Sequence, residues 1–165
     1  MTHPDLSGLF HTGMVVDNVE TAMSTFSKAF GYHWAEPIEL EAQCKTREGI
    51  LPRHSIATYS LEGPHHIELI QQIDDTAWKT ASGGPKVHHL GFWVDDLEES
   101  IERLGKLGFQ LEVEDVSGAL SYHYQSGMGL YIELVHARAR EQFDEWWDGK
   151  PLRWERTSSQ GDHSH

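Results

Sequence analysis

The sequence predicts an α+β fold made of two tandem βαβββ modules, and three observations carry this prediction. Residues 11–31 (HTGMVVDNVETAMSTFSKAFG) and 89–108 (HLGFWVDDLEESIERLGKLG) share His-x-Gly, an apolar stretch, Val-Asp, an amphipathic stretch and a glycine. Ile-Glu-Leu then occurs once in each half, at 67–69 and 132–134. Each copy thus has one histidine and one glutamate at matching places, which indicates a duplicated module.

The elements of module one follow from the chain in order. An apolar run predicts a strand over 12–16, and Asp17 or Asn18 would cap a helix that ends near Gly31. After this helix we expect an extended stretch over 33–40, a polar loop over 41–53, a strand over 55–60, a turn at Gly63-Pro64 and a strand over 65–71.

Module two repeats this order after a connector over 72–87, whose Gly83-Gly84-Pro85 forms a hinge. Its predicted elements are strands over 89–94, 110–116, 122–125 and 130–136, and a helix over 97–107 capped by Asp95 or Asp96. The chain is therefore read as one domain over 1–150, with module one at 9–72, module two at 87–136, a C-terminal helix at 137–150 and a partly disordered tail at 151–165.

The two halves differ in length after the first helix. The offset between them falls from 78 at His11 and His89 to 65 at Glu68 and Glu133, so module one has about a dozen more residues. The loop 41–53 is the natural place for them. An additional loop on a duplicated scaffold is a candidate lid or specificity element.

Composition excludes several classes of protein. The 165 residues suit one compact domain, and a net charge of −13 argues against a nucleic-acid partner. No apolar stretch reaches the length of a membrane span, and the N-terminus lacks a signal-peptide pattern. Cys44, the single cysteine, fits a reducing compartment. We therefore expect a cytoplasmic protein that acts on a small molecule, with no nucleic-acid or membrane partner.

The repeated histidines and glutamates point to metal chemistry. Two imidazoles and two carboxylates suit a divalent ion such as Zn, Ni, Co, Mn or Fe, with positions left for water or substrate. The repeat selects His89 over His88, which a regular strand would turn to the other face. In the same way Glu68 shares a face with His66 and Ile70, while Ile67 and Leu69 project oppositely. Roles for His65, His66, His88 and His123 stay open.

With this pattern the chain resembles the vicinal oxygen chelate superfamily, which includes glyoxalase I, methylmalonyl-CoA epimerase, extradiol dioxygenases and bleomycin-resistance proteins. The resemblance covers residues 9–136 and is strongest in GGPKVHHLGFWVDDL and GLYIELV. It implies a curved mixed sheet around a metal cleft. It also implies metal ligands at His11, Glu68, His89 and Glu133.

The resemblance implies a metal-dependent isomerase, epimerase or lyase in which Glu133 or Glu68 moves a proton. The His-Glu-His-Glu order is similar to bacterial glyoxalase I. The epimerases, in contrast, usually have glutamine where this chain has Glu68, and a glutamate base near the place of Pro52 or Arg53. An Fe(II) extradiol-type dioxygenase is the first alternative. A non-catalytic drug-binding or resistance protein is the second.

Aromatic residues bear on the ligand without identifying it. Trp34, Trp78 and Trp93 would suit a cationic aromatic ligand of a resistance protein. Tyr59, Tyr122 and Tyr124, together with Trp34 and Trp93, are compatible with a sizeable organic substrate and equally with core packing. A homodimer fits an exposed sheet edge, and the cleft could then form within one chain or between two. A purely structural domain with remnant ligands is the remaining reading.

Overall fold

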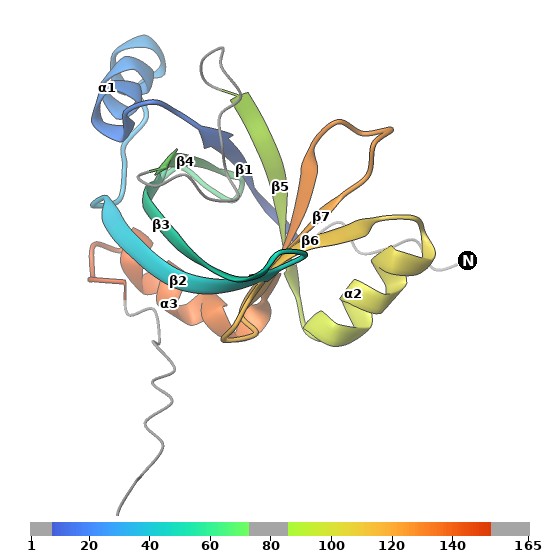
Figure 1. Ribbon diagram of the computed structural model, residues 1–165. Helices are drawn as coiled ribbons and strands as arrows, with labels where there is room; N and C mark the ends of the chain where they lie inside the picture. Colours follow the sequence, from blue (N-terminus) through green and yellow to red (C-terminus); the bar gives the residue numbers. More distant parts are fainter. Residues whose placement is uncertain (1–7, 73–85, 153–165) are drawn as a thin grey trace, which may run out of the picture.

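The computed structural model describes residues 8–72 and 86–152, and its centre is an eight-stranded closed barrel (Figure 1). The strands lie around the barrel in the order β1-β4-β3-β2-β6-β7-β8-β5. Their bounds are β1 Leu9–Val15, β2 Ile38–Thr46, β3 Gly49–Tyr59, β4 His66–Gln72, β5 Lys86–Val94, β6 Gln110–Asp115, β7 Leu120–Tyr124 and β8 Tyr131–His136. The predicted α+β fold with two βαβββ modules and a curved mixed sheet is confirmed.

The strand pairing repeats in the two halves. β1 and β4 pair in parallel in the first half, as β5 and β8 do in the second, while the remaining neighbours within each half are antiparallel. The halves meet at two places. β1 pairs with β5 over most of its length, whereas β2 and β6 share only the pairs Cys44↔Asp115 and Lys45↔Glu114. The barrel is therefore strongly joined on one side and narrowly joined on the other.

Two helices cover the outside of the barrel on opposite sides (Figure 1). Helix α1 (Val19–Phe30) is capped by the Asn18 side chain, which accepts a hydrogen bond from the Thr21 N–H, and helix α2 (Leu97–Lys106) is capped by Asp96. Leu69 of β4 packs under α1 and Leu134 of β8 packs under α2. Because these residues face outward, the alternating residues of the same strands face the interior of the barrel. The predicted division of residues 65–70 between two faces is confirmed.

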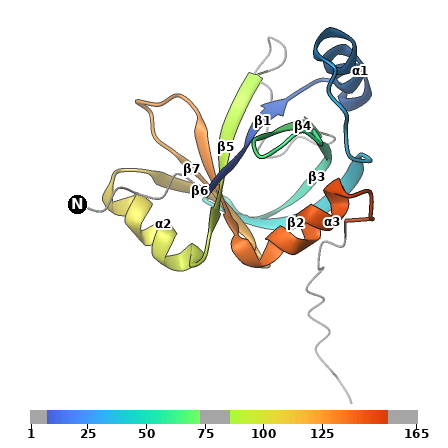
Figure 2. The same cartoon turned by 180° about the vertical axis from the view of Figure 1, so that it is seen from behind.

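A third helix covers part of the barrel's interior. A 3₁₀ turn at Ala137–Ala139 leads into α3 (Arg140–Trp147), so the C-terminal helix is shorter than the predicted 137–150. Phe143 and Trp146 are buried in the same core as Phe10 and Tyr59. The indole N–H of Trp146 also donates to the carbonyl of Glu36, at 3.2 Å, which fixes α3 beside the segment before β2 (Figure 2).

The prediction of a loop over 41–53 is wrong. These residues form a long β-hairpin in which nine residue pairs join β2 to β3, from Ile38↔Ala57 to Thr46↔Gly49. The hairpin is mostly polar because its outer side is solvated, and the inward residues of β2 are the apolar Leu40, Ala42 and Cys44. Pro52 fits because, within the described residues, β4 pairs with β3 over Ser55–Tyr59 and Pro52 has β2 as its strand neighbour.

The extra residues of module one therefore lengthen a hairpin. β2 and β3 contain 9 and 11 residues, against 6 and 5 in the equivalent β6 and β7. The extended stretch predicted over 33–40 contributes only one isolated bridge, Trp34↔Ser60, before β2 begins at Ile38. The Gly83-Gly84-Pro85 hinge, Trp78 and most of the 151–165 tail lie outside the described residues. Within 8–72 and 86–152, no helix is both long and apolar enough to cross a membrane.

Candidate metal centre

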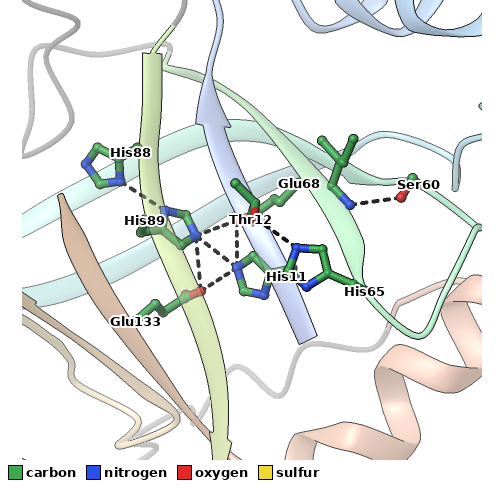
Figure 3. A network of polar contacts seen from close by, with 9 residues as sticks. His11, Thr12, Ser60, His65, Glu68, His88, His89 and Glu133 are labelled. Atoms are coloured by element: carbon green, nitrogen blue, oxygen red, sulfur yellow. Dashed lines mark hydrogen bonds and ion pairs between the residues drawn. The ribbon is translucent and has the colours of Figure 1, made fainter. Parts of the chain in front are cut away.

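Four neighbouring strands bring the repeated histidines and glutamates together inside the barrel. Around its wall the order is β4-β1-β5-β8, and these strands provide Glu68, His11, His89 and Glu133 respectively. All four side chains point toward one another (Figure 3). Each is at most 4% exposed. The structure thus collects the whole predicted set within one chain, so no second copy is needed to complete it.

The distances within this cluster are short. The Nε2 atoms of His11 and His89 lie 2.9 Å apart. Oε2 of Glu133 is 2.8 Å from His11 Nε2 and 3.3 Å from His89 Nε2. Oε2 of Glu68 is 2.9 Å from His89 Nε2 and 3.3 Å from His11 Nε2. Two nitrogens and two oxygens therefore converge on one point.

This donor set fits a divalent metal ion. Neighbouring ligand atoms bound at about 2.0–2.2 Å lie about 3 to 3.6 Å apart in a tetrahedral or octahedral shell, close to the separations seen here. Oε2 of Glu68 and Oε2 of Glu133 are buried, make no regular hydrogen bond with the described residues, and lie in ion-pair contact with the two imidazoles. Buried carboxylate oxygens ordinarily have a donor or a cation. The four residues could hold a metal that satisfies both oxygens and both imidazoles.

The glycine of each His-x-Gly motif makes room for the opposite histidine. A Cβ atom on Gly13 would lie 1.9 Å from Cε1 of His89, and one on Gly91 would lie 1.8 Å from Cε1 of His11. The strand register explains this, because Gly13 pairs with His89 and Gly91 pairs with His11 across the β1–β5 junction. Each imidazole therefore lies over the backbone of the other module's glycine.

His88 is not on the opposite face from His89, as a regular strand would require. The register between β1 and β5 shifts after the pair Gly13↔His89, since Met14 pairs with Val87 and His88 is left as an additional residue. Such a bulge turns two consecutive side chains to one side. His88 consequently stacks on the ring of Tyr131, with centroids 4.7 Å apart.

The bulge gives His89 a hydrogen-bond partner. Nδ1 of His88 lies 3.0 Å from Nδ1 of His89 (Figure 3). Burial, and next the charge of His89, lower the pKa of His88 to about 3, so His88 is neutral and accepts the hydrogen of His89 Nδ1. This contact fixes the His89 ring with Nε2 toward the carboxylates. A matching shift in module one places Phe10 against His11, whose Nδ1 has no hydrogen-bond partner among the described residues.

Two tyrosines flank the cluster at equivalent places. Tyr59 of β3 pairs with Glu68, and Tyr122 of β7 pairs with Glu133. Their rings lie edge-on to His11 and His89, in both cases with centroids 5.2 Å apart. Burial, and then the charge of the neighbouring glutamate, hold both phenol pKa values well above their usual range. Both tyrosines therefore stay protonated at neutral pH and can act only as donors toward the carboxylates.

The cluster resembles an ion-paired network when no metal is considered. Burial disfavours the charged imidazolium, but the two glutamates outweigh it, raising the pKa of His11 and raising that of His89 to about 9. Burial also opposes the carboxylate form of Glu68 and Glu133, and the two histidines again outweigh it and lower both carboxyl pKa values. At neutral pH both glutamates are ionised.

A cavity begins at this cluster and is lined mainly by apolar side chains. Its enclosed volume is about 40 Å³. The lining residues are Ile38, Leu40, Glu41 and Ala42 of β2, Arg53, Ala57 and Tyr59 of β3, Asp115, Leu120 and Val135 of the second half, Phe143, Trp146 and Leu152 near the C-terminus, and the cluster's Glu68 and Glu133. Ligand sites in proteins have this combination of apolar walls and a few polar groups.

Other residues considered from the sequence lie away from the cluster. Thr12 contacts His65 on the exposed surface, and the ring of His66 stacks on Trp147. The ring of His123 is buried beside Ser121. Trp34 packs in the core under α1, and Trp93 stacks on Phe10. Neither tryptophan is among the described residues that line the cavity, which weakens the reading of an aromatic site for a cationic ligand.

Three features of the site were missed by sequence reasoning. The role of His88 depends on a bulge that leaves no mark in the composition of the strand. The two tyrosines did leave a signal, since they precede the repeated glutamates by 9 and 11 residues, across a hairpin. Arg53 was assigned to a loop, whereas it lies in the barrel wall.

Comparison with known proteins agrees with this architecture. Residues 10–125 match the model of the glyoxalase/bleomycin resistance protein/dioxygenase superfamily. The chain belongs to this superfamily. A search of curated protein sequences found no match.

Solved structures share the superfamily fold at low identity. A methylmalonyl-CoA epimerase from Mycobacterium tuberculosis is 18% identical, with a TM-score of 0.58, over 82% of this chain and 92% of that one. A hypothetical protein from Bacillus halodurans is 17% identical, with a TM-score of 0.60, over 78% and 92%. A Streptomyces coelicolor methylmalonyl-CoA epimerase in complex with 2-nitronate-propionyl-CoA is 13% identical, with a TM-score of 0.57, over 78% and 96%.

The glycine packing predicts that Gly91→Ala weakens divalent-metal binding by at least about 10-fold, because the new methyl group displaces the His11 ring and ligand orientation controls affinity. Competition with a chromophoric chelator measures this. Gly105→Ala in α2 is the control, since no heavy atom would contact its Cβ. Equal affinity of the two folded variants would contradict the reciprocal packing.

The His88 contact predicts a separate effect on affinity. His88→Phe reproduces the residue type of Phe10 in module one, removes the acceptor for His89 Nδ1 and should raise the metal dissociation constant by about 10- to 100-fold. His65→Phe on the outer surface should leave the constant unchanged. The same chelator competition decides, and an unchanged constant for His88→Phe would remove His88 from the site.

The raised histidine pKa values predict a pH dependence with a definite sign. In the metal-free protein the His89 pKa of about 9 exceeds the ordinary 6.5. Protonated His89 therefore contributes fully to the free energy of unfolding below pH 6.5, and this contribution is lost as pH rises through 9. A metal must displace this proton. Affinity should therefore increase between pH 6.5 and 9, by up to about 10-fold per unit for one proton. Calorimetry at pH 7 in buffers of different ionisation enthalpy should detect proton release, and its absence would contradict the assignment.

Proposed function

We propose that the chain is a divalent-metal-dependent enzyme that moves a proton at a carbon next to a substrate carbonyl, as an isomerase, epimerase or lyase. The observation that carries this proposal is the convergence of His11, Glu68, His89 and Glu133 in one buried cluster at the base of a cavity. Superfamily membership supports it, since this fold accommodates such chemistry.

The four cluster residues would hold the metal in this proposal. When bound, a divalent ion supplies a Lewis acid that polarises a substrate oxygen and makes the neighbouring C–H more acidic. An imidazole and carboxylate set suits Zn, Ni, Co, Mn or Fe, and the residues alone do not select one of them.

The glutamates are the groups in this site that can accept a proton. Both line the cavity, and their lowered pKa values keep them ionised at neutral pH. Glu133 or Glu68 would therefore remove the proton beside the carbonyl and return it to the same or a neighbouring carbon. Tyr59 and Tyr122 would hold the remaining carboxylate lone pairs in place, because each stays protonated beside its glutamate.

The walls of the cavity favour such a step by limiting water. Phe143 and Trp146 of α3 form part of the cavity wall and pack against Tyr59. An apolar enclosure protects a carbanion-like species from protonation by solvent. The chain thus combines an ionised acceptor with an apolar enclosure.

The two alternatives require different arrangements. Extradiol-type chemistry uses Fe(II) with two histidines and one carboxylate, and here a second carboxylate lies as close to the imidazoles as the first. A non-catalytic binding protein would have no need of two ionised glutamates under its ligand. Proton transfer uses all four residues.

Metal analysis and hydrogen exchange together test the proposal. Purified wild-type protein should retain about one divalent ion per chain, and His11→Ala or His89→Ala should lose it, while His65→Ala on the outer surface should not. In D₂O, small carbonyl compounds should exchange the hydrogen next to the carbonyl. Glu133→Gln or Glu68→Gln should slow this exchange by about 10²- to 10⁴-fold, at metal content measured on the same samples.

A folded wild-type protein without metal affinity would overturn the metal-dependent function. Exchange that persists in both glutamate variants would overturn the role of these residues as proton acceptors. Oxygen consumption with catechols by an iron-loaded sample would favour the dioxygenase instead.

A further inference from the structure

Arg53 places a positive charge in the wall of the cavity. It lies on β3 with only 7% of its surface exposed. Alternation along the strand puts it on the same face as Ala57 and Tyr59, which also line the cavity. Among the described lining residues Arg53 is the only cation. Burying a guanidinium is costly, and Arg53 has partners within the protein that offset this cost; its place in the cavity wall also lets it face a bound ligand.

Arg53 lies within electrostatic reach of the cluster. Burial disfavours its charged form, but Tyr122, Cys44 and then the glutamates of the cluster raise its pKa. Asp115, another lining carboxylate, accepts a hydrogen bond from the Ser117 N–H and closes the turn after β6. As a lining residue, Arg53 can also face an anionic ligand in the cavity.

Ser55 provides a second polar group on the same face of β3. It lies two residues from Arg53 and is fully buried. Its hydroxyl has no hydrogen-bond partner among the described residues, although nearly all buried hydroxyls have one. Its pairing partner on β2 is Leu40, which lines the cavity. A guanidinium and a hydroxyl on one strand face can together bind an anionic group with two oxygens.

We propose that Arg53, assisted by Ser55, binds a carboxylate of the substrate, so that the site takes small carboxylic acids that have a carbonyl within reach of the glutamates. This inference rests on the proposed function and specifies its substrate class. Arginine suits the role because its planar fork binds a carboxylate through two parallel hydrogen bonds. The apolar side chains Leu40, Leu120 and Val135 would contact the remainder of the molecule.

Position in the hairpin supports this specificity role. Among the described residues, Arg53 belongs to the part of β3 that pairs with β2 alone, beyond the pair Ser55↔Gln72 with β4. The shorter hairpin of module two has no equivalent of this segment. The duplicated parts of the barrel thus provide the ligand set, and the unduplicated part provides the cation that would select the substrate.

Binding of matched probes to the metal-loaded protein tests the proposal. Pyruvate and its uncharged methyl ester differ only in the carboxylate. Calorimetric titration should give tighter binding of pyruvate than of the ester by wild-type protein. Arg53→Met should weaken pyruvate binding by about 10- to 100-fold, as expected for loss of a charged hydrogen bond, and leave ester binding unchanged. Arg47→Met, in the turn of the same hairpin and exposed, is the control and should match wild type.

Two further variants separate binding from structural support. Arg53→Lys retains the positive charge without the planar guanidinium, so it should weaken pyruvate binding by a smaller factor than Arg53→Met. If Arg53→Met does not fold, Arg53→Lys still provides the measurement. Ser55→Ala should weaken pyruvate binding several-fold without lowering the denaturation midpoint, because the hydroxyl has no partner in the unliganded protein. A merely structural arginine would alter stability and leave the ratio of pyruvate to ester binding unchanged.

Metal content on the same samples distinguishes the two ways in which the account can fail. A wild-type protein without metal overturns the proposed function and, with it, this inference. A metal-replete wild type that binds pyruvate no better than the ester overturns the carboxylate site alone. The same conclusion follows if metal-replete Arg53→Met retains full pyruvate affinity.

Discussion

The close contact between β1 and β5 is the constraint on which the rest of the structure depends. Each histidine ring lies directly over the backbone of the glycine in the other strand, at a distance that leaves no room for a Cβ atom. This packing brings the two Nε2 atoms to 2.9 Å from each other. On either side of the β1–β5 pair lies a parallel strand, β4 or β8, which provides Glu68 or Glu133. The cluster is therefore a consequence of how two His-x-Gly strands pair, and the helices and the barrel closure hold that pairing in place.

The two halves provide the same ligands but different surroundings. His88 accepts a hydrogen bond from His89, whereas Phe10 takes its place beside His11. The first half has a longer hairpin with Arg53 on its inner face, and the second half is followed by α3, which inserts Phe143 and Trp146 into the barrel. A symmetric donor set thus lies in an asymmetric cavity. Such asymmetry is required to bind a substrate in one orientation, because a two-fold symmetric pocket would accept it in two.

Much of this arrangement could be predicted from sequence because a repeat specifies register. Aligning His11 with His89 and Glu68 with Glu133 identified the cluster without knowledge of strand order, and the alternation of residues 65–70 gave the correct faces. The errors share a physical cause. The sequence predicts a loop over 41–53 because the outward residues of this hairpin are polar, and it predicts the wrong face for His88 because a bulge breaks the period of two. Arg53 could not be assigned to the cavity until the hairpin placed it there.

Anomalous diffraction from a crystal of the metal-loaded protein tests the central claim most directly. The account predicts one strong peak per chain between Nε2 of His11 and Nε2 of His89, at about 2.0–2.2 Å from both and from one oxygen each of Glu68 and Glu133. The two imidazoles should move only slightly, since Gly13 and Gly91 already fix their planes. A loaded crystal whose peak lies elsewhere, for example at the exposed group formed by Glu39, Glu41 and His54, with the buried cluster unchanged, would contradict it.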